Sequence, residues 1–238
     1  MTHRTGSFGS VRGAAKSKRP VKIPTPISVG ITLNSGMNVI LMGKGDLAVK
    51  IAGWFFSSTQ YKLVGVVPVL PEPTWTQSLL SWCEQNKVVV YNKHTDIPAG
   101  LDLVFSCFYD KILRKSFIEK HKRVLNLHNS PLPRYRGVNP INWALKNGET
   151  YHGVTIHEID EGIDTGPVVA QVKYSIYPEI EEVKDVYNKA LDYGWALFKS
   201  TAPLFANIQA VGQNDAEACY YSDKDRCLLG NRSSWTRN

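Results

Sequence analysis

Residues 37–69 read MNVILMGKGDLAVKIAGWFFSSTQYKLVGVVPV, and this stretch sets the fold class. Its apolar run at 39–42 is typical of a short buried strand, and residues 46–56 repeat apolar side chains at helical spacing. Residues 62–69 form a second apolar run. A strand, a helix and a strand therefore follow one another here.

The same alternation continues toward the C-terminus. We expect further helices at 75–85, at 116–120, after Pro140 and from Glu181 onward, and further strands at 88–90, 101–105, 124–127, 153–159 and 168–176. Continuous apolar strands between amphipathic helices indicate a parallel sheet covered on both faces. We therefore predict an α/β fold with a Rossmann-like, mostly parallel sheet and helices on both faces. Pro203 should kink or divide the last helix.

The positive charge of the chain is concentrated at its N-terminus. The net charge is +7, and residues 1–36 hold six basic residues and no acidic one. The remainder is nearly neutral, whereas a surface that binds nucleic acid usually needs a basic excess on the folded part. We predict a disordered basic tail at 1–36, a main domain at 37–211 that carries the motifs below, and a polar, irregular extension at 212–238. Two alternatives for 1–36 stay open: an organelle transit peptide, and a natural start at Met37.

The cysteines and the hydropathy pattern narrow the class of protein. Cys83, Cys107, Cys219 and Cys227 form no CxxC pair, and the first two stand among apolar residues. Neither a disulfide framework nor a zinc site is predicted, and a reducing cytoplasm is the expected location. No apolar run approaches the roughly 18 residues that span a bilayer, so no membrane association is expected.

Ligands of an open parallel sheet bind beyond the carboxyl ends of its strands, so the segment after each strand is informative. The first such segment, Gly43–Ala48, matches the dinucleotide fingerprint GxGxxA. That fingerprint also needs an acidic residue about 20 positions further on, and no Asp or Glu occurs between Asp46 and Glu72. The pattern therefore favours a tight strand-to-helix turn.

A second segment reads NLHNSPLPRYRG at 126–137. Asn126 and His128 are two residues apart on a strand, so their side chains share one face. An amide N–H can stabilise a developing oxyanion, and an imidazole can move a proton near neutral pH. The pair therefore suits acyl transfer, although a polar pair that merely closes a strand has the same pattern.

A third segment reads DEGIDTGP at 160–167. A carboxylate held there, at Asp164, can pair with an imidazolium. The alternative is a solvated acidic turn. His152 and His157, five apart on a predicted strand, should point to opposite faces and cannot share a metal.

The second and third motifs together resemble the formyltransferase family. The likeness is close over residues 101–173 and rests on NLHNSPLPRYRG and GVTIHEIDEGIDTGP. The family implies a catalytic set of Asn126, His128 and Asp164, with the first two polarising the formyl oxygen. Asp164 would tune the imidazole and help to take the proton of the attacking amine. The implied donor is 10-formyltetrahydrofolate, with no metal.

The resemblance also implies binding sites. Two loops would hold the pterin of the folate, and their residues are Lys111, Ile112, Leu113, Asp160 and Glu161. Asp46 would repel the phosphate that glycinamide ribonucleotide transformylases bind after their first strand, and residues 212–238 are too few for the tRNA-binding barrel of methionyl-tRNA formyltransferases. The best match is a sugar N-formyltransferase that acts on a nucleotide-linked amino sugar, with a homodimer as one assembly to be tested.

Two further questions stay open. Arg134 and Arg136 could bind a nucleotide pyrophosphate, or Arg134 could simply pack on Tyr135. A methionyl-tRNA formyltransferase-like enzyme without the C-terminal domain is the alternative function. A silent folate-binding module and a nicotinamide oxidoreductase are more distant ones.

Overall fold

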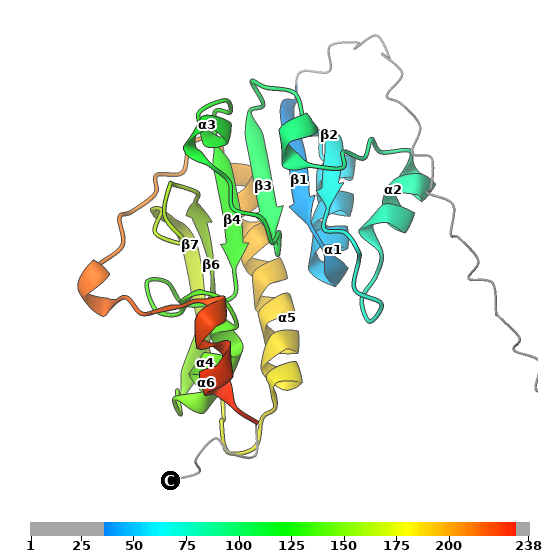
Figure 1. Cartoon of the computed structure of the whole chain (residues 1–238). Coiled ribbons are helices and arrows are strands. Elements are labelled where there is room, and N and C mark those ends of the chain that lie inside the picture. The colour runs from blue at the N-terminus through cyan, green and yellow to red at the C-terminus, as the bar shows by residue number, and fades with distance from the viewer. Residues whose placement is uncertain (1–35, 232–238) are drawn as a thin grey trace, which may run out of the picture. The chain divides into compact units, whose positions relative to one another are not determined.

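The computed structural model describes residues 36–231 (Figure 1). The prediction of a disordered tail at 1–36 therefore lies, apart from Gly36, outside the described residues, as do residues 232–238. Within the described range, no helix is long and apolar enough to cross a bilayer.

A six-stranded sheet forms the centre of the fold. Its strands, in spatial order, are β2 (Tyr61–Pro68), β1 (Met37–Gly43), β3 (Leu103–Cys107), β4 (Val124–His128), β6 (Tyr151–Glu158) and β7 (Val168–Ser175). The first four are parallel, whereas β6 is antiparallel to both β4 and β7. The predicted α/β class and mostly parallel sheet are confirmed.

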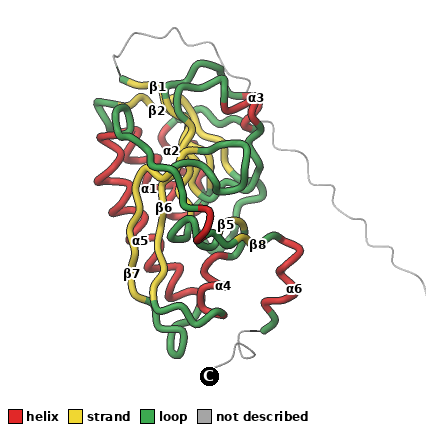
Figure 2. Tube along the Cα trace, turned by 90° about the vertical axis from the view of Figure 1, so that its left-hand side faces the viewer, coloured by secondary structure: helices red, strands yellow, loops and turns green. Residues whose placement is uncertain are grey.

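The two faces of the sheet are covered unequally. Long helices α1 (Gly45–Ser57) and α5 (Val183–Thr201) lie on one face, behind the sheet in Figure 1 and to the left of it in Figure 2. The short helices α2 (Leu79–Asn86) and α4 (Pro140–Lys146) bury residues in the same core. The other face carries the single-turn helix α3 (Lys115–Ile118), a 3-10 turn at His94–Asp96 and loops.

Aromatic rings fill the space between α5 and the sheet. Phe198 lies 5.3 Å from Phe55 and 5.2 Å from Phe105 between ring centroids, and all three are fully buried. Burial of this kind drives the docking of α5. Pro203 ends the long helix as expected, because α5 stops at Thr201 and a 3-10 turn, Ala202–Leu204, follows.

Replacing Phe198 with alanine is expected to lower the free energy of unfolding by about 3–5 kcal/mol, because a buried ring leaves a cavity that the core cannot refill. Urea unfolding would measure the loss. Phe56, half exposed on the same side of the fold, is the matched control: Phe56→Ala should cost much less. Equal losses for the two variants would contradict this account of the core.

Two predicted elements differ from the structure. Helix α2 begins at Leu79 rather than at residue 75, because Ser78 caps it and the Glu72 carboxylate accepts hydrogen bonds from the amides of Leu79 and Leu80. The predicted strand at 88–90 is wrong. Only Val90 bridges Val66 beside the sheet edge.

The described part of the C-terminal extension is also more ordered than predicted. It contains two 3-10 turns, Asp215–Glu217 and Asp223–Asp225, the strand β8 (Tyr220–Tyr221) and the helix α6 (Arg226–Leu229). β8 pairs in parallel with β5 (Arg136–Gly137), in the loop that follows β4. The sequence did not predict this pairing, because strands of two residues are too short to show an alternation of apolar and polar side chains.

Candidate active site

Asn126 and His128 lie at the carboxyl end of β4, two residues apart and on one face, as predicted. The antiparallel neighbour β6 sets His157 directly opposite Asn126. Side chains of directly opposed residues lie on the same face of an antiparallel pair. Three polar side chains, those of Asn126, His128 and His157, therefore lie together at the carboxyl end of β4, hereafter the sheet edge.

The amide of Asn126 contacts the ring of His157. The distance from Asn126 Nδ2 to His157 Nε2 is 3.2 Å, and His157 Nδ1 lies 2.7 Å from the carbonyl oxygen of Glu158. Since a carbonyl can only accept, Nδ1 donates to it. The second N–H of the Asn126 amide makes no hydrogen bond within residues 36–231.

His128 is buried and faces two oxygens. Its Nε2 donates to the carbonyl of Tyr135 at 2.9 Å, and its Nδ1 lies 3.5 Å from Asp164 Oδ2. A proton on Nδ1 would thus lie between the ring and the carboxylate. The gap is slightly longer than a hydrogen bond, as is common for catalytic pairs without substrate.

Asp164 is held between the two histidines. Its side chain is 13% exposed, Oδ1 lies 3.5 Å from His157 Nε2, and the amide of Gly137 donates to Oδ2 at 2.8 Å. Burial by itself would raise the pKa of Asp164, but the neighbouring His128, His157 and the Gly137 amide together lower it well below its ordinary value. The carboxylate of Asp164 therefore stays ionised at neutral pH.

The backbone at this edge is unusual. Phe108, Tyr135, Asn139 and Asp164 all have positive φ, and three of them stand in the loops that carry the site. Such conformations cost non-glycine residues free energy, and they cluster at functional sites. The loop after β4 is tied to β6 by Thr155, whose hydroxyl donates to Ser130 O at 2.6 Å.

The sequence comparisons agree with this geometry. A family model described as Formyl transferase matches residues 81–201, just over half of the chain. The chain belongs to the formyl transferase family. A methionyl-tRNA formyltransferase of Ehrlichia ruminantium is 28% identical over an alignment of 200 positions that covers 77% of this chain and 66% of that protein.

Solved structures of formyltransferases resemble the chain as well. WlaRD, a sugar 3N-formyl transferase crystallised in the presence of dTDP and 5-N-formyl-THF, has 29% sequence identity and a TM-score of 0.70, over 79% of this chain and 70% of that one. The N-formyltransferase of Helicobacter canadensis, in complex with folinic acid and dTDP-3-aminofucose, has 29% identity and a TM-score of 0.69, over 79% and 72%. The chain spans only 27% to 66% of the length of the curated relatives it matches.

In this formyl transferase family member, the two loops predicted to hold the folate lie beside each other. Lys115, just after the first loop, forms an ion pair of 2.6 Å with Glu161 of the second. Ile112 is 70% exposed, whereas Leu113 is buried in the core on the α3 face. Lys111 pairs with its neighbour Asp110.

The carboxylate of Asp160 is engaged within its own loop. It accepts from the Thr165 hydroxyl at 2.6 Å and from the Gly162 amide at 3.1 Å. Asp160 therefore shapes the loop that carries Asp164. A contact of Lys111–Leu113, Asp160 or Glu161 with folate stays a prediction.

Arg134 and Arg136 already have partners within the chain. Arg134 pairs with Glu149 and lies over the ring of Tyr135, 5.4 Å from its centroid, which is the packing alternative considered above. The Arg136 side chain is only 9% exposed and donates to Gln213 and Asp215. Contact of these arginines with a pyrophosphate stays a prediction, and the buried Arg136 has little surface left for it.

His157 was not among the predicted site residues. Its sequence position predicted only that it cannot share a metal with His152, and no group of three or more His, Cys, Asp or Glu in the described range is arranged to hold a metal. The signal that could have found His157 is the antiparallel pairing of β6 with β4, which sets it opposite Asn126. Pairing direction is not encoded in the alternation of a single strand.

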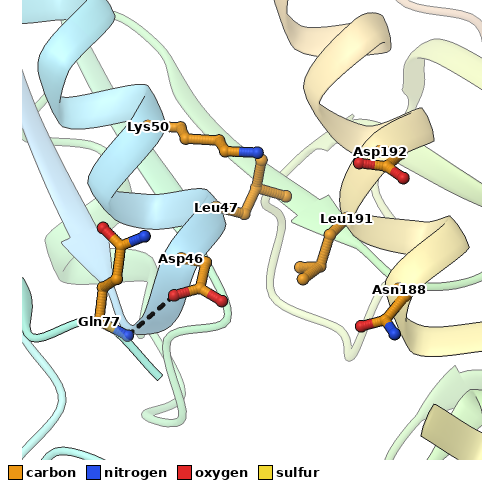
Figure 3. Close-up of a pocket in the computed structure, with 7 residues that line it drawn as sticks. All are labelled: Asp46, Leu47, Lys50, Gln77, Asn188, Leu191 and Asp192. Carbon is orange, nitrogen blue, oxygen red and sulfur yellow. Dashed lines mark hydrogen bonds between the residues drawn. The ribbon is translucent and has the colours of Figure 1, made fainter. Parts of the chain in front are cut away.

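A cavity of about 270 Å³ opens on the face of the fold that carries α1 and α5 (Figure 3). It lies between the first turns of α1 and the N-terminal half of α5, and its lining residues are Asp46, Leu47, Lys50, Gln77, Asn188, Leu191 and Asp192. The Asp46 carboxylate accepts a hydrogen bond of 2.8 Å from the backbone N–H of Gln77. The lining thus combines two carboxylates, a lysine and amides with two leucines.

Gly43 explains the turn beside this cavity. A Cβ at Gly43, where φ is +156°, would lie 1.9 Å from the carbonyl oxygen of Cys107. Only glycine permits this approach of the two strand ends, so the motif serves the tight turn favoured above.

Proposed function

We propose that this protein transfers a formyl group from 10-formyltetrahydrofolate to the primary amine of a nucleotide-linked amino sugar. The observation that carries the proposal is the convergence of Asn126, His128 and Asp164 at one sheet edge, with 3.5 Å between imidazole and carboxylate. The two sugar N-formyltransferases at 29% identity support the choice of acceptor and donor classes.

The chemistry follows from the positions of the polar atoms. The acceptor nitrogen forms a bond to the formyl carbon, and the bond between that carbon and the folate nitrogen breaks. The unused N–H of Asn126 would stabilise the negative charge that develops on the formyl oxygen. Asp164 would take the proton lost by the amine and pass it to the leaving nitrogen of the folate, while His128, through Nδ1, would hold the carboxylate in place.

Donor and acceptor would approach from different sides of this edge. The loops joined by the Lys115–Glu161 ion pair lie on the α3 side and suit the flat pterin, with Ile112 as an exposed apolar contact. The cavity lies on the side of α1 and α5, and its carboxylates and amides are groups that bind sugar hydroxyls. Two carboxylates against one lysine disfavour a phosphate there.

Replacing Asp46 with alanine is expected to raise KM for the acceptor about 10- to 100-fold, because one hydrogen bond to a charged group contributes about 1.5–3 kcal/mol. KM for the folate should change little, since its loops lie on the other side. Steady-state kinetics with each substrate varied would measure both constants. Asp223→Ala, at an exposed position, serves as the control. An unchanged acceptor KM for Asp46→Ala would remove the cavity from the proposal.

A panel of acceptors tests the function itself. The purified full chain would be incubated with 10-formyltetrahydrofolate and with dTDP- and UDP-linked amino sugars, and products would be followed by mass spectrometry. Formylation of at least one amino sugar, lost in His128→Ala, is expected. Failure with every amino sugar, or full turnover by His128→Ala, would refute the proposal.

A second candidate acceptor is the methionine of charged initiator tRNA, since curated relatives that match most of this chain are methionyl-tRNA formyltransferases. The same assay therefore includes methionyl-tRNA. If tRNA were the acceptor, deleting residues 1–36 with their six basic side chains would weaken its binding in a salt-dependent way. Equal tRNA formylation by the truncated and full chains would argue against the tail as a tRNA-binding element.

A further inference from the structure

The side chain of Gln213 bridges the two loops that carry the candidate site. Its Nε2 donates to the carbonyl of Asp164 at 2.8 Å and to that of Gly166 at 2.7 Å. Its Oε1 accepts from the guanidinium of Arg136, at 3.1 Å from Nε and 2.8 Å from Nη2. Both ends of the amide are therefore used.

This bridge links the two points that determine where the Asp164 carboxylate lies. One point is the main chain of Asp164, which Gln213 binds. The other is the amide of Gly137, which donates to Asp164 Oδ2 and directly follows Arg136 in the chain. Displacement of Gln213 would free both loops to move relative to each other.

The segment that carries Gln213 is anchored on both sides. Val211 and Val168 exchange two backbone hydrogen bonds of 2.8 Å, and β8 pairs with β5. The ring of Tyr221 stacks on Trp143 with 4.0 Å between centroids. A segment held at both ends can keep the Gln213 side chain in one place.

The backbone of Asp164 needs such support. Its φ is +55°, in the left-handed region. A non-glycine residue in this region costs free energy, and the conformation persists only where surrounding contacts offset that cost. Gln213 binds the carbonyl of Asp164 itself and that of Gly166, two residues further on, and so fixes the chain directly after this conformation.

We infer that Gln213, in the C-terminal segment 211–221, is a positioning residue that holds Asp164 against His128 and His157. The catalytic consequence of this inference rests on the proposed function, whereas the positioning of Asp164 by Gln213 does not depend on it. Through Gln213, the C-terminal extension becomes part of the candidate active site.

The test uses the full chain with two substitutions. Gln213→Leu removes all four hydrogen bonds, whereas Gln213→Glu keeps the contact to Arg136 and sets a carboxylate oxygen against the two carbonyls. Gln209→Leu is the matched control, because Gln209 is exposed and its side chain makes a single hydrogen bond within the described residues, a 3.4 Å one to Asn207 O. For both Gln213 variants, kcat should fall about 10- to 100-fold with KM for both substrates within about twofold, since small misplacements of catalytic groups act on the chemical step.

A second readout does not depend on activity. The titration of Asp164, followed by carboxyl ¹³C NMR, reports its distance from His128 on β4, from His157 on β6 and from the Gly137 amide. In both Gln213 variants the pKa of Asp164 should rise toward its ordinary value, and in Gln209→Leu it should not move.

Unchanged kcat together with an unchanged Asp164 titration in Gln213→Glu would overturn the inference, and so would equal losses in the Gln209 control. If the wild type formylates no acceptor, the proposed function fails, and the NMR titration alone then decides on Gln213. If Gln213→Leu does not fold, the kcat of Gln213→Glu decides, because the added carboxylate raises the pKa of Asp164 by its charge alone.

Discussion

Replacing Asp164 with asparagine is expected to lower kcat for formyl transfer by about 10²–10⁴-fold, the usual contribution of a positioned proton-transfer group. Asparagine keeps the shape of the side chain and can still accept from the Gly137 amide. It cannot take the proton of the attacking amine, and it has no negative charge to set against a protonated His128. The defect should therefore lie in the chemical step, while folate affinity survives.

Single-turnover kinetics with saturating folate would isolate that step. Asp96→Asn, at an exposed position, should retain wild-type turnover. Retention of more than about a tenth of the wild-type kcat by Asp164→Asn would show that this carboxylate does not take part in the proton transfer.

The same substitution should change how stability depends on pH. The folded pKa of Asp164 is depressed, so its ionisation stabilises the fold fully above the unfolded value of 3.8, and that stabilisation is lost as pH falls through the folded pKa. The wild type should thus exceed Asp164→Asn in Tm at pH 5–7. The difference should shrink steadily below about pH 4. A gap that widens in acid would contradict the assignment.

Replacing Asn126 with alanine is expected to lower kcat by about 10²–10³-fold, the loss seen when one oxyanion donor is removed. The amide is the donor best placed for this role, because His128 directs Nε2 to Tyr135 and Nδ1 to Asp164. Rapid-quench measurement of product formation would test it, with the exposed Asn207→Ala as the control.

Asn126 also contacts His157, so an indirect effect has to be separated. A double-mutant cycle with His157→Ala does this. If Asn126 acts directly on the substrate, Asn126→Ala should reduce kcat well beyond His157→Ala, and it should still reduce it in the His157→Ala background. Identical losses in the two single variants and the double variant would mean that Asn126 acts only through His157.

Local pattern predicted most of the sheet and its helices. The segments at 39–42, 62–69, 124–127 and 168–176 each correspond to an observed strand, because an apolar run between turn residues depends on near neighbours alone. The prediction of a strand at 88–90 was wrong because it depended on a distant segment. This segment pairs with β2 only at Val66, and the three residues themselves do not show how far the pairing with β2 extends.

The residue types and spacings of the sequence alone determined the α/β class, the placement of Asn126 and His128 on one strand face, and the acidic loop with Asp164. These properties follow from periodicity and from motifs within a few residues. Only the tertiary structure decided that His157 lies opposite Asn126, 31 residues away, and that Gln213 binds the Asp164 backbone, 49 residues away. Strand direction and loop docking arise from packing between distant segments, and no local pattern encodes them.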